Sequence, residues 1–425
     1  MSIAPQPVTV TLKQGQVTGL QTQSVTQFLG LRYAQAPTGA LRFAPPQALG
    51  PQAPFDATQA GPVCPQLPSR LRTVMGDFEA VQDEDCLRLA IWTPGCDQHK
   101  RPVVVWLHGG AWQSGGGALA WYDGTRLAAK GDCVVVGVNY RLAALGWLYM
   151  PGETANMGLL DEEAAVRWVV DNIEHFGGDP ANITMLGQSA GGFNIAAMLA
   201  REPLFSRAIL QSASLGRGFR EPAQAAHLSR VFLQAAGAQT VEQARALPVA
   251  SLLAAQQAPS VMAALKEEGA NRSLFCPVGD AEFFRLPLAP LMQHAATRAD
   301  VLLGYTRDEM TAFPGTERDT ASQQLGEKIF GAPSRQWAQD AHAAGRQAWV
   351  FEFAYGPNPA LGACHCSELP FVFGNLESFD GAAMLQGMPA EHGVRLVEQM
   401  QSAWIAFIQG RSPGWASSPA VHVFE

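Results

Sequence analysis

The feature that most constrains this chain is a serine set between a strand-like run and a helix-like run at residues 182–200. The segment reads NITMLGQSAGGFNIAAMLA, so an apolar stretch enters Gly-x-Ser-x-Gly and continues directly into a helical pattern. The backbone must reverse sharply there, and Gly187 and Gly191 permit the close approach that such a turn requires. We therefore expect Ser189 to present its hydroxyl above a sheet, beside a helix N-terminus that favours negative charge.

The same five-residue pattern occurs a second time, at residues 410–414 (GRSPG). This copy follows a helical stretch, contains a proline and enters no helix, so it lacks the strand-to-helix context. We predict that Ser412 is an ordinary loop serine.

Apolar, β-rich runs recur along the chain between helical or turn-rich segments. Most of these runs are continuously apolar, which is typical of strands covered by helices on both faces. Alternation of strands and helices over this length predicts an α/β fold with a mostly parallel central sheet. Residues 7–24 instead resemble a small antiparallel hairpin, and residues 161–175 have the spacing of a helix. The six clearest strand-like runs are residues 103–107, 133–138, 183–186, 208–211, 301–304 and 349–353.

Residues 216–299 contain no strand signal and are rich in Ala, Gln and Leu, so we expect several helices there. Two interpretations stay open. The segment is either a helical excursion that forms a cap or wall over one end of the sheet, or a continuation of the outer helical layer. In both cases we treat residues 1–425 as a single domain, because large α/β sheets often reach this length.

Composition and charge exclude several classes of partner. A formal net charge of −8 without a basic patch argues against binding of nucleic acid or of an anionic membrane surface. The apolar windows are too short and too interrupted to span a bilayer, and the N-terminus does not resemble a secretion signal. Seven cysteines, an odd number in a long chain, do not resemble a disulfide framework. We expect a cytoplasmic protein.

A second segment relevant to chemistry is residues 103–112 (VVVWLHGGAW), a buried strand that ends in His-Gly-Gly. Small residues there let backbone N–H groups point toward a developing oxyanion, as acyl transfer requires. We assign this role to the amides of Gly110 and Ala111, together with that of Ala190, the residue after the nucleophile. An ordinary glycine turn is the alternative interpretation. His108 belongs to the same loop, and we expect it to be structural rather than a base.

By these and several further blocks the sequence resembles the type-B carboxylesterase/cholinesterase family of α/β-hydrolases. The blocks are spread over most of the chain in the order that the family shows. They are FLGLRYAQAPTGALRFAPPQ (28–47), EDCLRLAIWTP (84–94), NYRLAALGWL (139–148), NMGLLDEEAAVRWVVDNIEHFGGDPANITMLGQSAGG (156–192), PLFSRAILQSAS (203–214), GYTRDEMTAF (304–313) and CHCSELPFVFGN (364–375).

The resemblance identifies the two partners of the serine, which nine histidines and 37 acidic residues would otherwise leave open. It implies that Glu309 is the acid and His365 is the base. Asp308 is the rival acid, but adjacent side chains point apart, so only one of the two can face the histidine. The implied activity is hydrolysis of neutral, small to medium carboxylic esters through an acyl-enzyme, without metal or organic cofactor. The alternatives are an amidase with the same triad or a catalytically silent binding module.

Other parts of the resemblance are structural. It implies that Arg42 pairs with Glu84 and Arg141 with Asp161. Cys64 and Cys86 match the family's first disulfide, but a reducing compartment would leave them as thiols. Cys364 and Cys366 flank His365, and a metal site is disfavoured there because neighbouring side chains diverge. We also expect Trp112 and Phe193 to line the substrate pocket.

The chain departs from the family in three respects. Gln188 stands where many relatives have glutamate, and residues 65–85 contain no tryptophan, so we expect a weak preference for cationic substrates. Only 56 positions separate Glu309 from His365, and this stretch and the one after His365 are shorter than is usual in the family. These lengths predict a more open pocket that tolerates bulky esters. Cys366 replaces a residue that is usually glycine, which we expect to shift the His365 backbone slightly.

Overall fold

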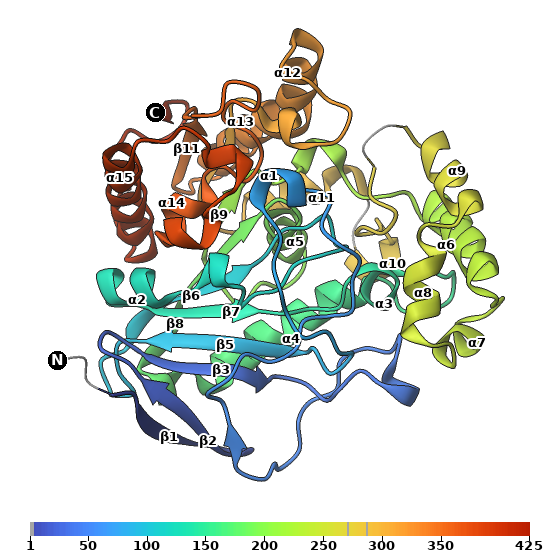
Figure 1. The fold of residues 1–425 in the computed structure, drawn as a ribbon, viewed down its shortest axis with the longest axis horizontal. Helices are drawn as coiled ribbons and strands as arrows, with labels where there is room; N and C mark the ends of the chain where they lie inside the picture. Colours follow the sequence, from blue (N-terminus) through green and yellow to red (C-terminus); the bar gives the residue numbers. More distant parts are fainter. Residues whose placement is uncertain (1–3, 270–271, 286–287) are drawn as a thin grey trace.

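The computed structural model describes residues 4–269, 272–285 and 288–425. At its centre lies one mixed sheet in the order β1-β2-β3-β5-β7-β6-β8-β9-β10-β11-β12, with β4 paired to β2 outside this path (Figure 1). The pairs from β1 to β7 along this order are antiparallel, and those from β7 to β12 are parallel. The mostly parallel sheet and the N-terminal antiparallel hairpin are therefore confirmed.

The strands that make up the sheet are β1 (Gln6–Leu12), β2 (Gly15–Gln21), β3 (Thr26–Arg32), β4 (Phe55–Asp56), β5 (Arg88–Thr93), β6 (Arg101–Leu107), β7 (Val134–Val138), β8 (Gly178–Gln188), β9 (Arg207–Gln211), β10 (Asp300–Thr306), β11 (Ala348–Phe353) and β12 (Val421–Phe424). The α-helices are α1 (Arg72–Met75), α2 (Thr125–Gly131), α3 (Ala143–Trp147), α4 (Met157–Asn172), α5 (Ala190–Leu199), α6 (Pro222–Ala236), α7 (Val241–Arg245), α8 (Val249–Ala255), α9 (Pro259–Glu267), α10 (Ala281–Phe284), α11 (Leu288–Ala296), α12 (Thr320–Gly326), α13 (Ala332–Ala343), α14 (Leu369–Phe373) and α15 (Ala390–Ile408).

Successive side chains of the central strands enter two different hydrophobic cores. In β6, Val103 and Val105 join the core that also contains residues of α4 and α5, whereas Val104 and Trp106 join the core that contains residues of α2, α14 and α15. Side chains of a strand point alternately to the two faces, so a strand buried on both faces must be apolar throughout. This double burial explains the continuous apolar runs of the sequence.

The parallel strands bring their carboxyl ends to one edge of the sheet. Strands β6, β8, β9 and β10 are neighbours in parallel register, so the segments that follow Leu107, Gln188, Gln211 and Thr306 meet there. Sites in open α/β sheets form at this edge, where loops from adjacent strands converge. The candidate residues therefore lie in the expected part of the fold.

The predicted helical segment at residues 216–299 contains α6 to α11 and no strand among its described residues. Figure 1 shows α6, α7, α8 and α9 grouped on one side of the molecule, away from β1 and β2. Residues of this segment, including Gln256 and Met262, line a hollow together with Leu67 and Gln113. This placement fits a helical segment that forms a wall beside the sheet edge. That the whole chain is one domain stays a prediction.

Two ion pairs that the family resemblance implied are present. Arg42 Nε lies 2.6 Å from Glu84 Oε1, and Arg141 Nη2 lies 2.7 Å from Asp161 Oδ1 in a pair that is almost fully buried. Cys64 and Cys86 are both buried and are free thiols. None of the described helices combines the length and hydrophobicity that crossing a membrane would require.

Candidate active site

Ser189 occupies the sharp turn between β8 and α5. Its backbone angles, φ 54° and ψ −117°, lie outside the ordinary regions for a residue with a side chain. A Cβ on Gly187 would meet the backbone of Gly191, and a Cβ on Gly191 would collide with the carbonyl oxygen of Leu107. Both glycines are therefore required by close backbone contact, as the sequence pattern predicts.

Three side chains that are distant in sequence meet at this turn. The Ser189 hydroxyl donates to Nε2 of His365 at 2.8 Å, and Nδ1–H of His365 donates to Oε2 of Glu309. The backbone N–H of Thr306 donates to the other oxygen, Oε1 of Glu309, at 3.0 Å, which fixes the carboxylate. With Nδ1 protonated toward Glu309, Nε2 is free to accept the serine proton. The structure thus brings together all three residues that the resemblance implied.

Asp308 points away from the histidine. Its Oδ1 accepts from Nε of Arg318 at 3.0 Å, and its Oδ2 accepts from the backbone N–H of Ala363 at 3.0 Å. This arrangement agrees with the expectation that only one of the adjacent acids can face the imidazole. Asp308 ties the loop that carries His365 to the end of β10.

The imidazole of His365 is held by its surroundings as well as by its hydrogen bonds. The rings of Phe313 and Phe330 each lie 5.2 Å from the imidazole, measured between centroids. The side-chain amide of Gln188 lies 3.2 Å from His365 Nε2 and 3.2 Å from Cys366 Sγ. An uncharged amide thus faces the imidazole. Cys366 has φ 74°, a left-handed conformation that glycine adopts more easily.

Two of the three residues whose amides were assigned to the oxyanion, Gly110 and Ala111, lie in the loop that borders the hollow of Ser189. Gly110 has φ 112° and Ala111 has φ 55°, so the loop after β6 turns its backbone through conformations unusual for L-residues. Both residues line the hollow that holds Ser189 and His365. Among the residues that the structure describes, the N–H groups of Gly110, Ala111 and Ala190 find no hydrogen-bond acceptor. Amides without a partner beside a nucleophile are available to a developing negative charge.

His108 lies behind the site rather than in it. Its Nδ1 hydrogen-bonds to the carbonyl oxygen of Gly109 at 2.7 Å, and its ring stacks on Tyr140 with centroids 4.5 Å apart. Burial lowers its pKa to about 4, so the ring is neutral at ordinary pH. These contacts suit the structural role that the sequence analysis expected.

Trp112 and Phe193 do not line the hollow that contains Ser189. Their rings pack edge to face with centroids 5.7 Å apart, and both side chains are buried. The physical reason is a hydrogen bond at 2.7 Å from the indole Nε1 of Trp112 to Asn194 Oδ1, which turns the indole into the core. The geometry does not support the expected lining role.

Sequence reasoning missed the polar chain behind Trp112. Asn194 Nδ2 donates to Glu162 Oε1 at 2.7 Å, and Glu162 Oε2 has no partner among the described residues. Burial raises the pKa of Glu162 well above its usual value. The sequence signal was a polar residue, Asn194, within an otherwise apolar helix start. This chain connects the loop of Ala111 to the middle of α4.

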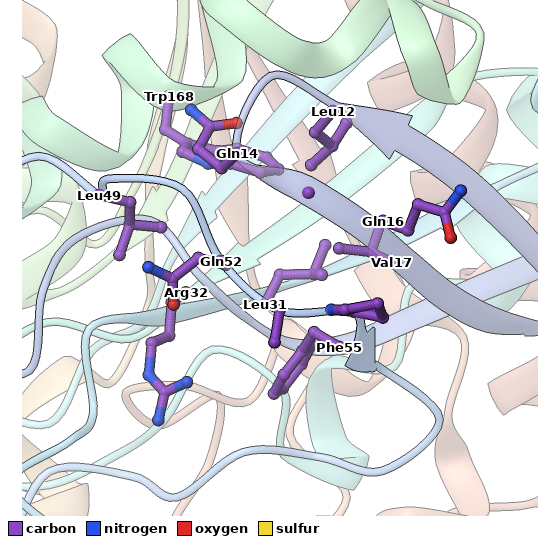
Figure 2. Close-up of a pocket in the computed structure, with 13 residues that line it drawn as sticks. Leu12, Gln14, Gln16, Val17, Leu31, Arg32, Leu49, Gln52, Phe55 and Trp168 are labelled. Atoms are coloured by element: carbon purple, nitrogen blue, oxygen red, sulfur yellow. The ribbon is translucent and has the colours of Figure 1, made fainter.

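The hollow at Ser189 has a volume of about 50 Å³ and adjoins two larger ones, of about 730 and 700 Å³, which share Leu67, Pro68 and Arg70 with it. A separate pocket lies at the β1–β2 turn against Phe55 and Trp168 (Figure 2). That pocket contains none of the candidate residues, so it is not the site. No group of three potential metal ligands occurs within residues 4–269, 272–285 and 288–425.

A mostly parallel, helix-covered sheet with a serine on the strand-to-helix turn defines an α/β-hydrolase. Comparison with known proteins agrees. Residues 6–320 match the model of the carboxylesterase family. The chain is 37% identical to a probable N-octanoylanthranilate hydrolase of Rhodococcus erythropolis, over 96% of this chain and 94% of that protein. It is 34% identical to the para-nitrobenzyl esterase of Bacillus subtilis (strain 168), over 97% and 92% respectively.

Solved structures give the same result. A thermophilic para-nitrobenzyl esterase superposes with a TM-score of 0.87 at 31% identity, over 96% of this chain and 93% of that one. A Geobacillus stearothermophilus carboxylesterase superposes with a TM-score of 0.81 at 31% identity, over 97% and 93%. The chain belongs to the type-B carboxylesterase family and is a serine carboxylesterase.

Proposed function

We propose that this enzyme hydrolyses small to medium carboxylic esters through a Ser189–His365–Glu309 triad and an acyl-enzyme intermediate. The observation that carries the proposal is the continuous hydrogen-bond chain from the Ser189 hydroxyl through both imidazole nitrogens to the Glu309 carboxylate. Ser189 and His365 line a hollow that Gly110 and Ala111 also line.

The geometry supports the following sequence of events. His365 Nε2 takes the proton of Ser189 as the hydroxyl oxygen attacks the ester carbonyl. Glu309 keeps the ring oriented and stabilises the imidazolium. The amides of Gly110, Ala111 and Ala190 stabilise the negative oxygen of the tetrahedral intermediate. The imidazolium then protonates the departing alcohol, and water repeats these steps to release the acid.

The test is removal of the nucleophile, with the second serine of the same pattern as a matched control. Replacing Ser189 with Ala should reduce kcat on 4-nitrophenyl butyrate by about 10⁴-fold or more, because no acyl-enzyme can form. Ser412→Ala, at an exposed loop serine, should leave kcat unchanged. Substantial turnover by Ser189→Ala, or labelling of another side chain by an organophosphate, would falsify the assignment.

Amide hydrolysis is a second candidate, favoured by one observation. The relative at 37% identity carries the name of a hydrolase whose substrate is an N-octanoyl compound. Ester and amide cleavage differ chiefly in the need to protonate the leaving nitrogen, which His365 would also supply. Turnover of 4-nitrophenyl butyrate compared with the matching 4-nitroanilide decides between them. We expect the ester to be the faster substrate by orders of magnitude.

A further inference from the structure

Two arginines from distant segments, Arg70 and Arg272, line one hollow that adjoins the catalytic one, and the charges of both act on a third, Arg217. Arg70 belongs to the loop before α1, Arg217 follows β9, and Arg272 follows α9. We call these residues the arginine cluster. The charges of Arg272 and Arg70 both act on Arg217, whose pKa burial and these two neighbours lower to about 10. Like charges held together at partly buried positions are costly unless a counter-charge relieves them.

None of the three guanidinium groups has a counter-charge in the described parts of the chain. No ion pair and no side-chain hydrogen bond is formed by Arg70, Arg217 or Arg272 there. Glu268, the acid near the end of α9, is engaged by Arg220 at 3.0 Å. Most other arginines that the structure describes pair with an acid, so these positions differ from the usual pattern. Donors are therefore present at this cluster without acceptors.

The position of Arg70 links the cluster to the reaction. Arg70 lines the hollow that contains Ser189 and His365, and it also lines both of the larger hollows that adjoin it. In one of these, Arg272 and Lys266, both from the helical segment 216–299, line the hollow together with Leu67 and Gln113. A ligand that extends from Ser189 into this space therefore passes Arg70 and approaches Arg272.

The charged residues that line the three hollows, among those that the structure describes, are all basic. The described residues that line the three connected hollows include Arg70, Arg72, Lys266 and Arg272, and no Asp or Glu. The protein as a whole carries a formal net charge of −8, so a purely positive entrance is not a consequence of composition. Hollows lined by one sign of charge attract and orient ligands of the opposite sign.

We propose that the preferred substrates are carboxylic esters that carry a second, ionised carboxylate, which Arg70 binds with the support of Arg217 and Arg272. This rests on the proposed esterase function. A guanidinium binds a carboxylate through two parallel N–H···O bonds, which makes arginine suited to this recognition. Water attacks the acyl-enzyme as it would with any other ester substrate. The second carboxylate of the substrate therefore takes part in binding and not in bond cleavage.

The proposal modifies one expectation drawn from the sequence. Because glutamine replaces glutamate at position 188, the sequence predicted a weak preference for cationic substrates. Neutral esters were therefore the expected substrates. The arginine cluster acts in the same direction, because it repels cations, but it adds attraction for anions. The sequence could not show this, since the three arginines are far apart along the chain and no motif contains them.

The experiment uses matched pairs of esters with the wild-type enzyme. One pair places the charge on the alcohol side, 4-butyryloxybenzoate and 4-butyryloxybenzamide. The other places it on the acyl side, the mono-4-nitrophenyl ester of suberic acid and 4-nitrophenyl octanoate. We expect the anionic member of at least one pair to have the higher kcat/KM, by about fivefold or more. The preference should shrink at high salt, because ionic strength screens an accessible ion pair.

Arg70→Gln then tests the assigned residue, with Arg167→Gln as the control. Arg167 is exposed on α4 and lines none of the three hollows, so the control changes net charge by the same amount. Arg70→Gln should raise KM for the preferred anionic ester by about fivefold and change kcat little, because the contact exists in both ground and transition states. The neutral partner ester should be affected less than about twofold, and Arg167→Gln should change neither.

Two results would overturn the proposal while leaving the esterase function intact. One is equal kcat/KM for the charged and neutral members of both pairs. The other is an anion preference that survives in Arg70→Gln and in Arg217→Gln. Failure of the proposed function would look different, since neutral esters would then not be hydrolysed, or their hydrolysis would not depend on Ser189.

Discussion

At His365 one acceptor atom, Nε2, faces two donors: the Ser189 hydroxyl at 2.8 Å and the Gln188 amide at 3.2 Å. Gln188→Glu would replace the amide with a carboxylate. A negative charge at this distance favours the imidazolium over the neutral ring. The enzyme needs the neutral imidazole, and the acid limb of the kcat/KM profile should therefore move to higher pH by about 1 unit. Profiles of the variant and the wild type that coincide would contradict this.

The adjacent acids provide a second test at the scale of single residues. Glu309→Gln removes the charge that faces His365 and should lower kcat by about 10³ to 10⁴-fold, because the tautomer and the imidazolium lose their support. Asp308→Asn is the matched control, since Asp308 faces Arg318 and Ala363 instead. We expect it to lower the melting temperature and to change kcat far less. The measurement is steady-state kinetics beside thermal unfolding of both variants.

At the scale of single residues, the sequence predicted the positions that belong to a strong local pattern or to a family motif. The positions of Ser189, Gly187 and Gly191 follow from backbone contacts that only this pattern allows. The orientation of Trp112 did not follow, because it depends on a hydrogen bond to Asn194, 82 positions away. Side-chain direction in a loop is set by such distant partners, which no local spacing reveals.

Among the elements, the loop that connects β7 to α3 is fastened to α4 by the Arg141–Asp161 pair. The exposed fractions of the two side chains are 2% and 0%. Asp161→Asn should cost about 3–5 kcal/mol of unfolding free energy, because it leaves a buried guanidinium without its counter-charge. The exposed pair between Arg126 and Glu377 serves as the comparison, with side chains 50% and 64% exposed.

For that exposed pair, Glu377→Gln should change the unfolding free energy by less than about 1 kcal/mol. Denaturant unfolding of both variants gives the comparison. Similar losses of unfolding free energy in the two variants would mean that burial does not determine how much these ion pairs contribute to stability.

The elements were predicted unevenly. All six apolar runs are strands, β6 to β11, and each of them pairs in parallel with at least one neighbour. They could be predicted because a continuous apolar sequence reflects burial on two faces of a sheet. Strands β3, β4, β5 and β12 were not among the predicted runs. In β3 and β12, half-exposed residues such as Gln27 and His422 interrupt the apolar pattern, β4 has only two residues, and β5 is a short apolar run between Arg88 and Thr93. Their pairing depends on partners elsewhere in the sheet.

At the scale of the whole molecule, long-range charge was the least predictable property. Net charge correctly indicates an acidic protein, but the charged residues that line the hollows at the site are basic, and only the folded chain brings Arg70 and Arg272 to one hollow. The same holds for buried acids. Nothing in the pattern of residues distinguishes Glu162 and Glu368 from the exposed glutamates, yet both are fully buried.

These two buried acids predict how the stability of the molecule depends on pH. Burial raises the pKa of Glu368 to about 7 and raises that of Glu162 well above its ordinary value. Above the pKa of the unfolded chain, the folded protein therefore binds more protons than the unfolded one, so stability falls as pH rises. The loss from Glu368 ends near pH 7, its pKa in the folded protein.

Glutamine variants isolate this effect, because each keeps the oxygen that accepts a hydrogen bond from Gln211 or Asn194. Glu368→Gln should match the wild type near pH 5 and exceed its unfolding free energy by about 3 kcal/mol at pH 8, the equivalent of a pKa shift of two to three units. Glu391→Gln, at an exposed position on α15, is the control and should follow the wild-type curve. Denaturant unfolding from pH 5 to 8 measures all three proteins. If the Glu368→Gln and wild-type curves stay parallel across that range, the carboxyl is ionised in the folded state and the inferred proton uptake is wrong.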